Sequence, residues 1–207
     1  MPGGRAGRNG VSPELVTGHT DEEMHDLRVP EIQTARLLLR GYVMADVPEL
    51  VRLLAAREVV AMTLRIPYPY TEEHANEFVA GSQEGDDARF AIVLRDEARL
   101  CGGIGLRVEP QHEHAELGYW VGVPYWGNGY ASEAAKAVVR FGFDELGLHR
   151  IFGSVFAGNE SSKRVLLKLG MGYEGCLREH YSKWGKFLDS ELYGLLRSEW
   201  QKLQGGA

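Results

Sequence analysis

Hydrophobic residues recur along this chain with two different periods, and stretches of the two kinds alternate. Short stretches with a period of two, bounded by Gly, Pro or Asp, predict strands. Longer stretches with a period of three to four predict helices. The predicted strands cover residues 34–42, 88–96, 99–109, 112–122, 149–157, 172–180 and 187–196. The predicted helices cover residues 45–60, 71–85, 131–147 and 159–170, and a short helix follows the last strand.

Capping residues set the expected ends of the helices. Asp46 and Pro48 suit the first turn of the first helix. Thr71 suits the start of the second helix, and Gly85 its end. Asn159 suits the N-cap of the helix over 159–170, because its side chain can accept a hydrogen bond from a free helix amide.

The order of these elements indicates an α+β fold. Strands and helices mix along the chain, which favours one mixed, mostly antiparallel central sheet of about seven strands with helices on both faces. Residues 1–33 are rich in Gly, Pro and charge without a sustained period, so we expect a flexible N-terminal tail. Residues 34–203 are expected to form a single domain.

Composition excludes several classes of function. The chain has 207 residues, is 44% hydrophobic and 25% charged, and carries a net charge of -6, which is unlike a basic nucleic-acid-binding domain. No apolar run approaches the roughly 20 residues that span a bilayer, and the first ten residues lack the apolar core of a signal peptide. We therefore expect a cytoplasmic protein with neither a nucleic-acid nor a membrane partner.

The stretch "ELGYWVGVPYWGNGYASEA" (116–134) joins a strand to a helix through a glycine-rich turn. The first amides of a helix have no internal partner, and the helix dipole adds positive charge there. Glycines allow a phosphate to approach the backbone closely, so the amides of residues 127–132 are candidates for a pyrophosphate site. The alternative is a tight turn whose glycines only provide a positive φ.

This turn resembles the acyl-CoA pyrophosphate loop of the GNAT superfamily of N-acetyltransferases. In "WGNGYA", Gly129 and Ala131 fill the glycine and small-residue positions of the family's pattern Q/R-x-x-G-x-G/A. Trp126 replaces the usual Gln or Arg, a departure typical of the RimJ/RimL-like branch, which acetylates N-termini of ribosomal proteins. "TARLLLR", "FDELGLHRI", "NESSKRVLLKLGM" and "EGCLRE" resemble the same branch in the same order.

The resemblance implies an acetyl-CoA-dependent N-acetyltransferase that uses no metal. It implies that the strand over 116–121 splays from the strand over 149–157, and that pantetheine runs between them. Aromatic residues would wall this slot, namely Tyr119, Trp120, Tyr125 and Trp126, although Tyr119 also suits the hydrophobic core. The cofactor-binding residues are expected to be Tyr119, Trp120, Val121, Trp126, Gly127, Asn128, Gly129, Tyr130, Ala131, Ser132 and Asn159.

Glu116 is the candidate general base. Side chains alternate along a strand, so Glu116 lies with His112 and His114 on the polar face of the predicted cofactor strand. An α-amine has a pKa near 8, so a carboxylate acting through water can suffice. The alternative is that Glu116 only forms hydrogen bonds to neighbouring strands or to the substrate. A zinc site at His-x-His-x-Glu lacks an apparent further ligand, so we expect no metal.

Ser162 and Asn159 are the candidates on the helix that follows. Ser162 falls on the apolar stripe of that helix, where a polar residue needs a partner. By resemblance, Asn159 contacts pantetheine and Ser162 is the acid near the sulfur. The alternative is an N-terminal capping pair. Lys163 and Arg164 are equally compatible with the 3′-phosphate and with solvent, and Cys101 and Cys176 match no nucleophile position in the family.

Three functions follow from these expectations. The leading one is acetyl transfer to a primary amine, most simply the α-amine of a protein such as a ribosomal protein. A small-molecule acetyltransferase acting on an antibiotic, amino acid or polyamine is the second, and a non-catalytic acyl-CoA-binding sensor is the third. The oligomeric state stays open, with a homodimer as one option.

Overall fold

A single eight-stranded sheet forms the centre of the protein in its computed structural model, which describes residues 29–82 and 84–205. The order of the strands across the sheet is β1-β2-β3-β4-β5-β6-β8-β7. The strands are β1 (Ile32–Gln33), β2 (Leu37–Arg40), β3 (Ala88–Leu94), β4 (Arg99–Glu109), β5 (His114–Val121), β6 (Arg150–Phe156), β7 (Gly172–Lys183) and β8 (Lys186–Leu196). The helices are α1 (Val47–Leu54), α2 (Arg57–Ala61), α3 (Glu72–Ala80), α4 (Tyr130–Asp144), α5 (Glu160–Lys168) and α6 (Arg197–Gly205).

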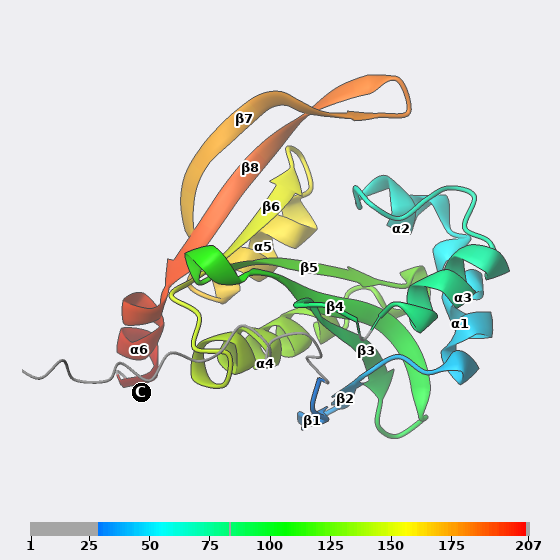
Figure 1. The fold of residues 1–207 in the computed structure, drawn as a ribbon. Helices are drawn as coiled ribbons and strands as arrows, with labels where there is room; N and C mark the ends of the chain where they lie inside the picture. The colour runs from blue at the N-terminus through cyan, green and yellow to red at the C-terminus, as the bar shows by residue number, and fades with distance from the viewer. Residues whose placement is uncertain (1–28, 83, 206–207) are drawn as a thin grey trace, which may run out of the picture.

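The sheet opens between β5 and β6. This pair is parallel, whereas the other neighbouring strands pair antiparallel. Pairing between β5 and β6 covers three positions and ends at Glu116 opposite Phe152. Beyond that point the two strands diverge, and Figure 1 shows the opening between them. The splay that the family resemblance implied is therefore present.

Helices cover both faces of the sheet and bury two separate hydrophobic clusters (Figure 1). α4, α5 and α6 bury residues such as Val138 and Leu166 against one face, and α1, α2 and α3 bury residues such as Leu50 against the other. Neighbouring residues of β3 show the alternation, because Ala91 belongs to the second cluster and Ile92 to the first. The predicted α+β architecture is confirmed.

Local signals located most elements but not all their ends. The predicted helix over 45–60 is wrong as one element, because Ala56 has φ -71° and ψ 114° and separates α1 from α2. Leu54 and Val59, on either side of the break, are both buried in the same cluster, so tertiary packing outweighs the helix propensity of the alanines. Thr71 caps α3 as predicted, but α3 ends at Ala80, with Gly81 as its C-cap, and not near Gly85.

The sheet has one strand more than the seven expected. Ile32 and Gln33 form β1 and pair with β2, although the sequence pattern assigned them to the tail. Residues 1–28 of that tail lie outside the described residues. β7 and β8 are also longer than predicted, and they meet in a hairpin that arches over the opening of the sheet toward α2 (Figure 1).

The tip of this hairpin contacts α2 and the segment that follows it. Lys183 Nζ donates to the carbonyl oxygens of Val60, at 2.7 Å, and of Thr63. The indole ring of Trp184 lies 5.6 Å from the ring of Tyr68 and 4.9 Å from the guanidinium carbon of Arg57. These contacts join segments more than 100 residues apart and form a roof over the opening.

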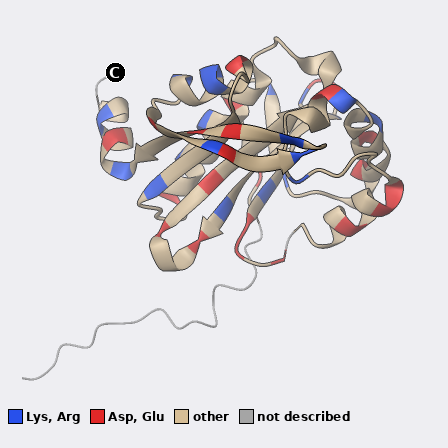
Figure 2. Ribbon diagram, turned by 90° about the horizontal axis from the view of Figure 1, so that it is seen from above, with Lys and Arg blue, Asp and Glu red and all other residues tan. Residues whose placement is uncertain are grey.

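Charged residues of both signs are interspersed over the helices and strands in Figure 2. Within residues 29–82 and 84–205, no helix is long and apolar enough to cross a membrane.

Candidate active site

The glycine-rich turn after β5 adopts a backbone that favours glycine. A 3₁₀ turn over Val123–Tyr125 follows the strand, and α4 begins at Tyr130. Gly127 and Gly129 have φ values of 79° and 80°, in the left-handed region that other residues rarely adopt. A Cβ atom on Gly127 would meet no atom within 4 Å, so conformation rather than crowding within the protein requires this glycine.

The amides of this turn are free. In the part of the chain that the structure describes, the backbone N–H groups of residues 127–132 donate no hydrogen bond. They precede a 15-residue helix, whose dipole adds partial positive charge at the same place. A run of unpaired amides at such a helix start is a ready site for a phosphate group.

Two side chains brace the turn from within. Trp126 Nε1 donates to the carbonyl oxygen of Val121 at 2.6 Å. Asn128 Nδ2 donates to the carbonyl oxygens of Tyr125 and Trp126, both at 3.2 Å. Trp126 and Asn128 therefore fix the shape of the turn through their side chains, a role that the sequence did not indicate.

Arg36, immediately before β2, ties the turn to the sheet, and sequence reasoning missed it. Its Nη1 donates to Asn128 O at 2.9 Å, and its Nε donates to Glu133 Oε2 at 2.7 Å. Thr34 Oγ1 donates to Glu133 Oε1 at 2.6 Å. Burial raises the pKa of Glu133, but the hydrogen bonds from Thr34 and Arg36 outweigh burial and lower it. The carboxylate in the first turn of α4 is thus compensated beside the predicted phosphate site.

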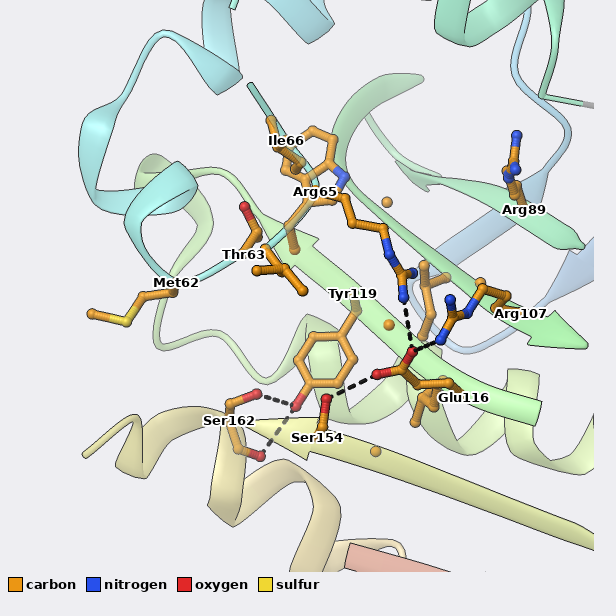
Figure 3. A pocket seen from close by; sticks show the side chains of 18 of the residues that line it. Met62, Thr63, Arg65, Ile66, Arg89, Arg107, Glu116, Tyr119, Ser154 and Ser162 are labelled. Carbon is orange, nitrogen blue, oxygen red and sulfur yellow. Dashed lines mark hydrogen bonds and ion pairs between the residues drawn. The ribbon is translucent and has the colours of Figure 1, made fainter. Parts of the chain in front are cut away.

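Ser162 and Tyr119 meet across the opening between β5 and β6. The Tyr119 hydroxyl lies 2.7 Å from Ser162 Oγ and 3.1 Å from the carbonyl oxygen of Ser162 (Figure 3). Burial raises the pKa of Tyr119 to about 12, although the hydrogen bond with Ser162 acts in the opposite direction. Tyr119 packs against the core as one sequence interpretation expected, but its hydroxyl also reaches the candidate acid.

Asn159 caps α5 and keeps its donors available. Its Oδ1 accepts hydrogen bonds from Ser162 N at 3.2 Å and from Ser161 Oγ at 2.9 Å. Among the described residues, Asn159 Nδ2 has no hydrogen-bond acceptor. The capping alternative is therefore realised through the oxygen, and the amide nitrogen is free to contact a ligand.

Glu116 lies on the opposite face of β5, held by three partners (Figure 3). Ser154 Oγ donates to Oε1 at 2.8 Å, whereas Arg65 and Arg107 donate to Oε2 at 3.0 and 2.6 Å. Burial raises the pKa of Glu116, but the hydrogen bonds from Ser154 and Arg65 and the charges of Arg65 and Arg107 outweigh it, so the pKa is lowered. A carboxylate with a lowered pKa is a weak proton acceptor.

A cavity of about 820 Å³ is lined by candidate residues from both faces of β5, but not by Val121 or by residues 126–132 of the glycine-rich turn. Its lining includes Glu116 and Trp120 from one face of β5, and Tyr119 from the other, so the cavity passes through the opening of the sheet. Asn159 and Ser162 of α5 also line it. A Cβ atom on Gly118 would meet no atom within 4 Å, so the strand surface is bare where it faces the cavity.

The remaining candidates lie outside this centre. Within the described residues, no group of three His, Cys, Asp or Glu side chains is placed to hold a metal ion. Lys163 Nζ lies 3.5 Å from Glu191, and Cys101 is buried, which raises the pKa of its thiol to about 12. Cys176 is exposed, and neither cysteine lines the cavity.

Comparisons with known proteins agree with this arrangement. Residues 36–172 match the protein family described as "Acetyltransferase (GNAT) domain". The chain is 35% identical over 171 residues to "Uncharacterized N-acetyltransferase YnaD" of Bacillus subtilis, covering 82% of this chain and 98% of YnaD. It is 32% identical over 106 residues to "Putative ribosomal N-acetyltransferase YdaF" of the same organism, covering 51% of this chain and 58% of YdaF.

A solved structure shows the same architecture. The crystal structure of a GNAT-family acetyltransferase from Bacillus anthracis superposes with a TM-score of 0.75 at 29% sequence identity. The match covers 82% of this chain and all of that chain.

Proposed function

Because the chain belongs to the GNAT family of acetyltransferases, we propose that it transfers an acetyl group from acetyl-CoA to the α-amine of a peptide or protein N-terminus. GNAT acetyltransferases use acetyl-CoA, and the chain is an acyltransferase by its family. The observation that carries the proposal is the opening between β5 and β6, with free amides beyond one end and a cavity through its middle.

Acetyl-CoA binds along β5 in this proposal. The amides of residues 127–132 receive the pyrophosphate, as the free N–H groups and the dipole of α4 favour. Because pairing with β6 ends at Glu116, the following residues of β5 have no ladder partner on that side and can pair with the pantetheine amides. Asn159 Nδ2 adds a donor at the thioester end.

Direct transfer forms one bond and breaks another. The neutral amine attacks the thioester carbonyl to form the C–N bond, and the C–S bond of the tetrahedral intermediate then breaks. Ser162 Oγ gives its proton to the leaving thiolate and takes one from the Tyr119 hydroxyl. Solvent water then returns a proton to Tyr119, whose pKa of about 12 makes the neutral phenol its resting form at neutral pH. The proton of the new ammonium leaves through water.

Glu116 acts chiefly through its charge. Its lowered pKa makes it a poor match for abstracting the proton of an amine near pKa 8. As an anion in the wall of the cavity, it instead stabilises the positive charge that develops on the attacking nitrogen. We therefore propose water as the proton acceptor and Glu116 as the electrostatic partner of the amine.

Two arguments favour an α-amine acceptor. The relative YdaF is named as a ribosomal N-acetyltransferase with the qualifier "putative", which suggests the same acceptor class here. An α-amine near pKa 8 is substantially neutral at physiological pH, whereas a lysine amine near 10.4 requires a stronger base than the cavity offers.

The test is a CoA-release assay with the purified full chain over N-terminal peptides, free amino acids, polyamines and aminoglycosides. Mass spectrometry locates the acetyl group on each product. We expect release with peptides and acetylation of their α-amine. Release confined to small molecules would contradict the protein acceptor but retain the enzyme, and binding of acetyl-CoA without release to any acceptor would contradict the proposed function.

A further inference from the structure

Two arginines in the wall of the cavity keep most of their hydrogen-bond donors unused. Arg65 comes from the segment between α2 and α3, and Arg107 comes from β4. Each uses one terminal nitrogen on the same oxygen of Glu116. Across residues 29–82 and 84–205, neither guanidinium has another hydrogen-bond or ion-pair partner. Because a guanidinium carries five N–H donors, both side chains can bind a further anion.

The positive charge at this place exceeds the negative charge. The side chains of Arg65 and Arg107 are 58% and 53% exposed, whereas that of Glu116 is 15% exposed, so the two guanidinium groups are more accessible to a ligand than the carboxylate that they share. The whole lining contains three arginines and three carboxylates. Asp87 is paired with Arg89, and Glu77 lies on the exposed surface of α3. The excess of positive charge is therefore confined to the place where Arg65 and Arg107 share Glu116.

We propose that Arg65 and Arg107 bind a carboxylate of the acceptor, so that the substrates of this enzyme are primary amines that carry a carboxylate on the same molecule. The inference rests on the proposed N-acetyl transfer. Planar guanidinium groups bind carboxylates through paired, charge-assisted hydrogen bonds. Two guanidinium groups on different elements can bind the same carboxylate from two directions, which a single arginine at the rim cannot do.

The arrangement of the cavity gives the acceptor a direction. In Figure 3, Ser162 and Tyr119 lie at one end, Glu116 and Ser154 in the middle, and Arg107 at the other end, with Arg65 above Glu116. An amine directed toward the Ser162–Tyr119 pair therefore places the rest of its molecule beside the arginines. A carboxylate there meets two cations, whereas a second ammonium meets the same two cations and is repelled.

This site selects between acceptor classes. Polyamines and aminoglycosides carry several positive charges and no carboxylate, so the arginines disfavour them. The carboxylate can come from two sources. One is the α-carboxylate of a free amino acid, and the other is an Asp or Glu side chain at the start of a peptide.

The experiment compares matched acceptors that differ in one charge. Free amino acids are compared with their amides, and peptides beginning with Asp or Glu are compared with those beginning with Asn or Gln. The readout is the ratio of kcat/KM for the acid to kcat/KM for its amide, measured for the wild-type chain and for Arg65→Gln, Arg107→Gln and Arg99→Gln. Arg99 lies on the same strand as Arg107, is 59% exposed, and does not line the cavity, which makes it the matched control.

We expect the wild-type ratio to be about tenfold or more in at least one arm, because a carboxylate held by guanidinium groups is lost in the amide. The ratio should fall toward one in Arg65→Gln and in Arg107→Gln and stay unchanged in Arg99→Gln. The arm that shows the preference identifies the source of the carboxylate. A general loss of folding or of Glu116 function lowers kcat/KM for the acid and for the amide alike, so it leaves their ratio unchanged and does not imitate the effect.

Equal rates with acids and amides, or faster rates with polyamines, would overturn the inference and leave the acetyltransferase intact. A preference for acids that persists in both arginine variants would overturn it as well. No CoA release with any member of the panel would contradict the proposed function and this inference with it.

Discussion

The two sides of the opening between β5 and β6 differ in the groups that they offer a ligand, which are backbone amides on one side and side chains on the other. On the side of α4, the candidate cofactor site consists mainly of backbone, namely free amides of residues 127–132 and left-handed glycines within one continuous stretch. On the side of α2, the candidate acceptor site consists of side chains from distant segments, with Arg65, Arg107 and Ser154 meeting on Glu116.

The difference separates a constant task from a variable one. A site made of backbone keeps its shape when side chains change, and it suits a ligand that every member of a family shares. A site made of converging side chains changes with single substitutions, and it suits a ligand that differs between members. We therefore expect substitutions on the α4 side to change the Kd for acetyl-CoA, and substitutions on the α2 side to change the kinetic constants for the acceptor.

The largest expected effect is on the cofactor side. Gly129→Val forces a β-branched residue to a φ of 80°, which costs roughly 1–3 kcal/mol or displaces the amides. Calorimetry should show the Kd for acetyl-CoA rising by about 100-fold, because each 1.4 kcal/mol is tenfold in affinity. Gly85→Val is the matched control, because Gly85 has a φ of 79° but neither lines the cavity nor belongs to the glycine-rich turn. Equal affinities in the two variants would contradict the backbone site.

The second effect is at the junction of the two sides. Ser162→Ala and Tyr119→Phe should each lower kcat by about 100-fold with little change in the Kd for acetyl-CoA, because the acid acts as the sulfur leaves. The double variant should lose scarcely more than either single variant, since the two hydroxyls act as one unit. Tyr173→Phe, on the exposed face of β7, is the control. A parallel loss of acetyl-CoA affinity would indicate a binding role instead.

A third, smaller effect distinguishes the two interpretations of Glu116. Its lowered pKa keeps Glu116 ionised from pH 6 to 9, so the fall of kcat/KM below about pH 8 should follow protonation of the acceptor amine. Glu116→Gln should lower kcat/KM by about tenfold at every pH from 6 to 9 and leave the position of this limb unchanged. A limb that moves in the variant would show that Glu116 takes the proton itself, as the sequence had suggested.

The smallest effect concerns the roof on the acceptor side. Trp184→Ala removes contacts with Arg57 and Tyr68 that hold the hairpin tip against the segment carrying Arg65. Exposed cation–π contacts contribute about 0.5–1 kcal/mol each, so the acceptor KM should rise about three- to fivefold. Phe187→Ala, at a 68% exposed position of the same hairpin, should change nothing. An altered Kd for acetyl-CoA in Trp184→Ala would contradict the separation of the two sides.

The same contrast explains what the sequence could predict. Seven of the eight strands, the cap at Asn159 and the glycine turn depend on local patterns, and the structure has them close to where those patterns placed them, whereas β1 was missed. The pairing of Tyr119 with Ser162 joins residues 43 positions apart, and that of Arg65 with Glu116 joins residues 51 apart. No spacing rule connects such pairs, because tertiary packing alone brings them together.

The central claim is that acetyl-CoA lies in the opening, with its pyrophosphate on the amides of residues 127–132 and its pantetheine along β5. A titration of the ¹⁵N-labelled chain with acetyl-CoA, followed by amide NMR, tests both parts at once. We expect the largest chemical-shift changes at the amides of residues 127–132 and of 117–121. Saturable binding that leaves the amides of 127–132 unshifted would contradict it.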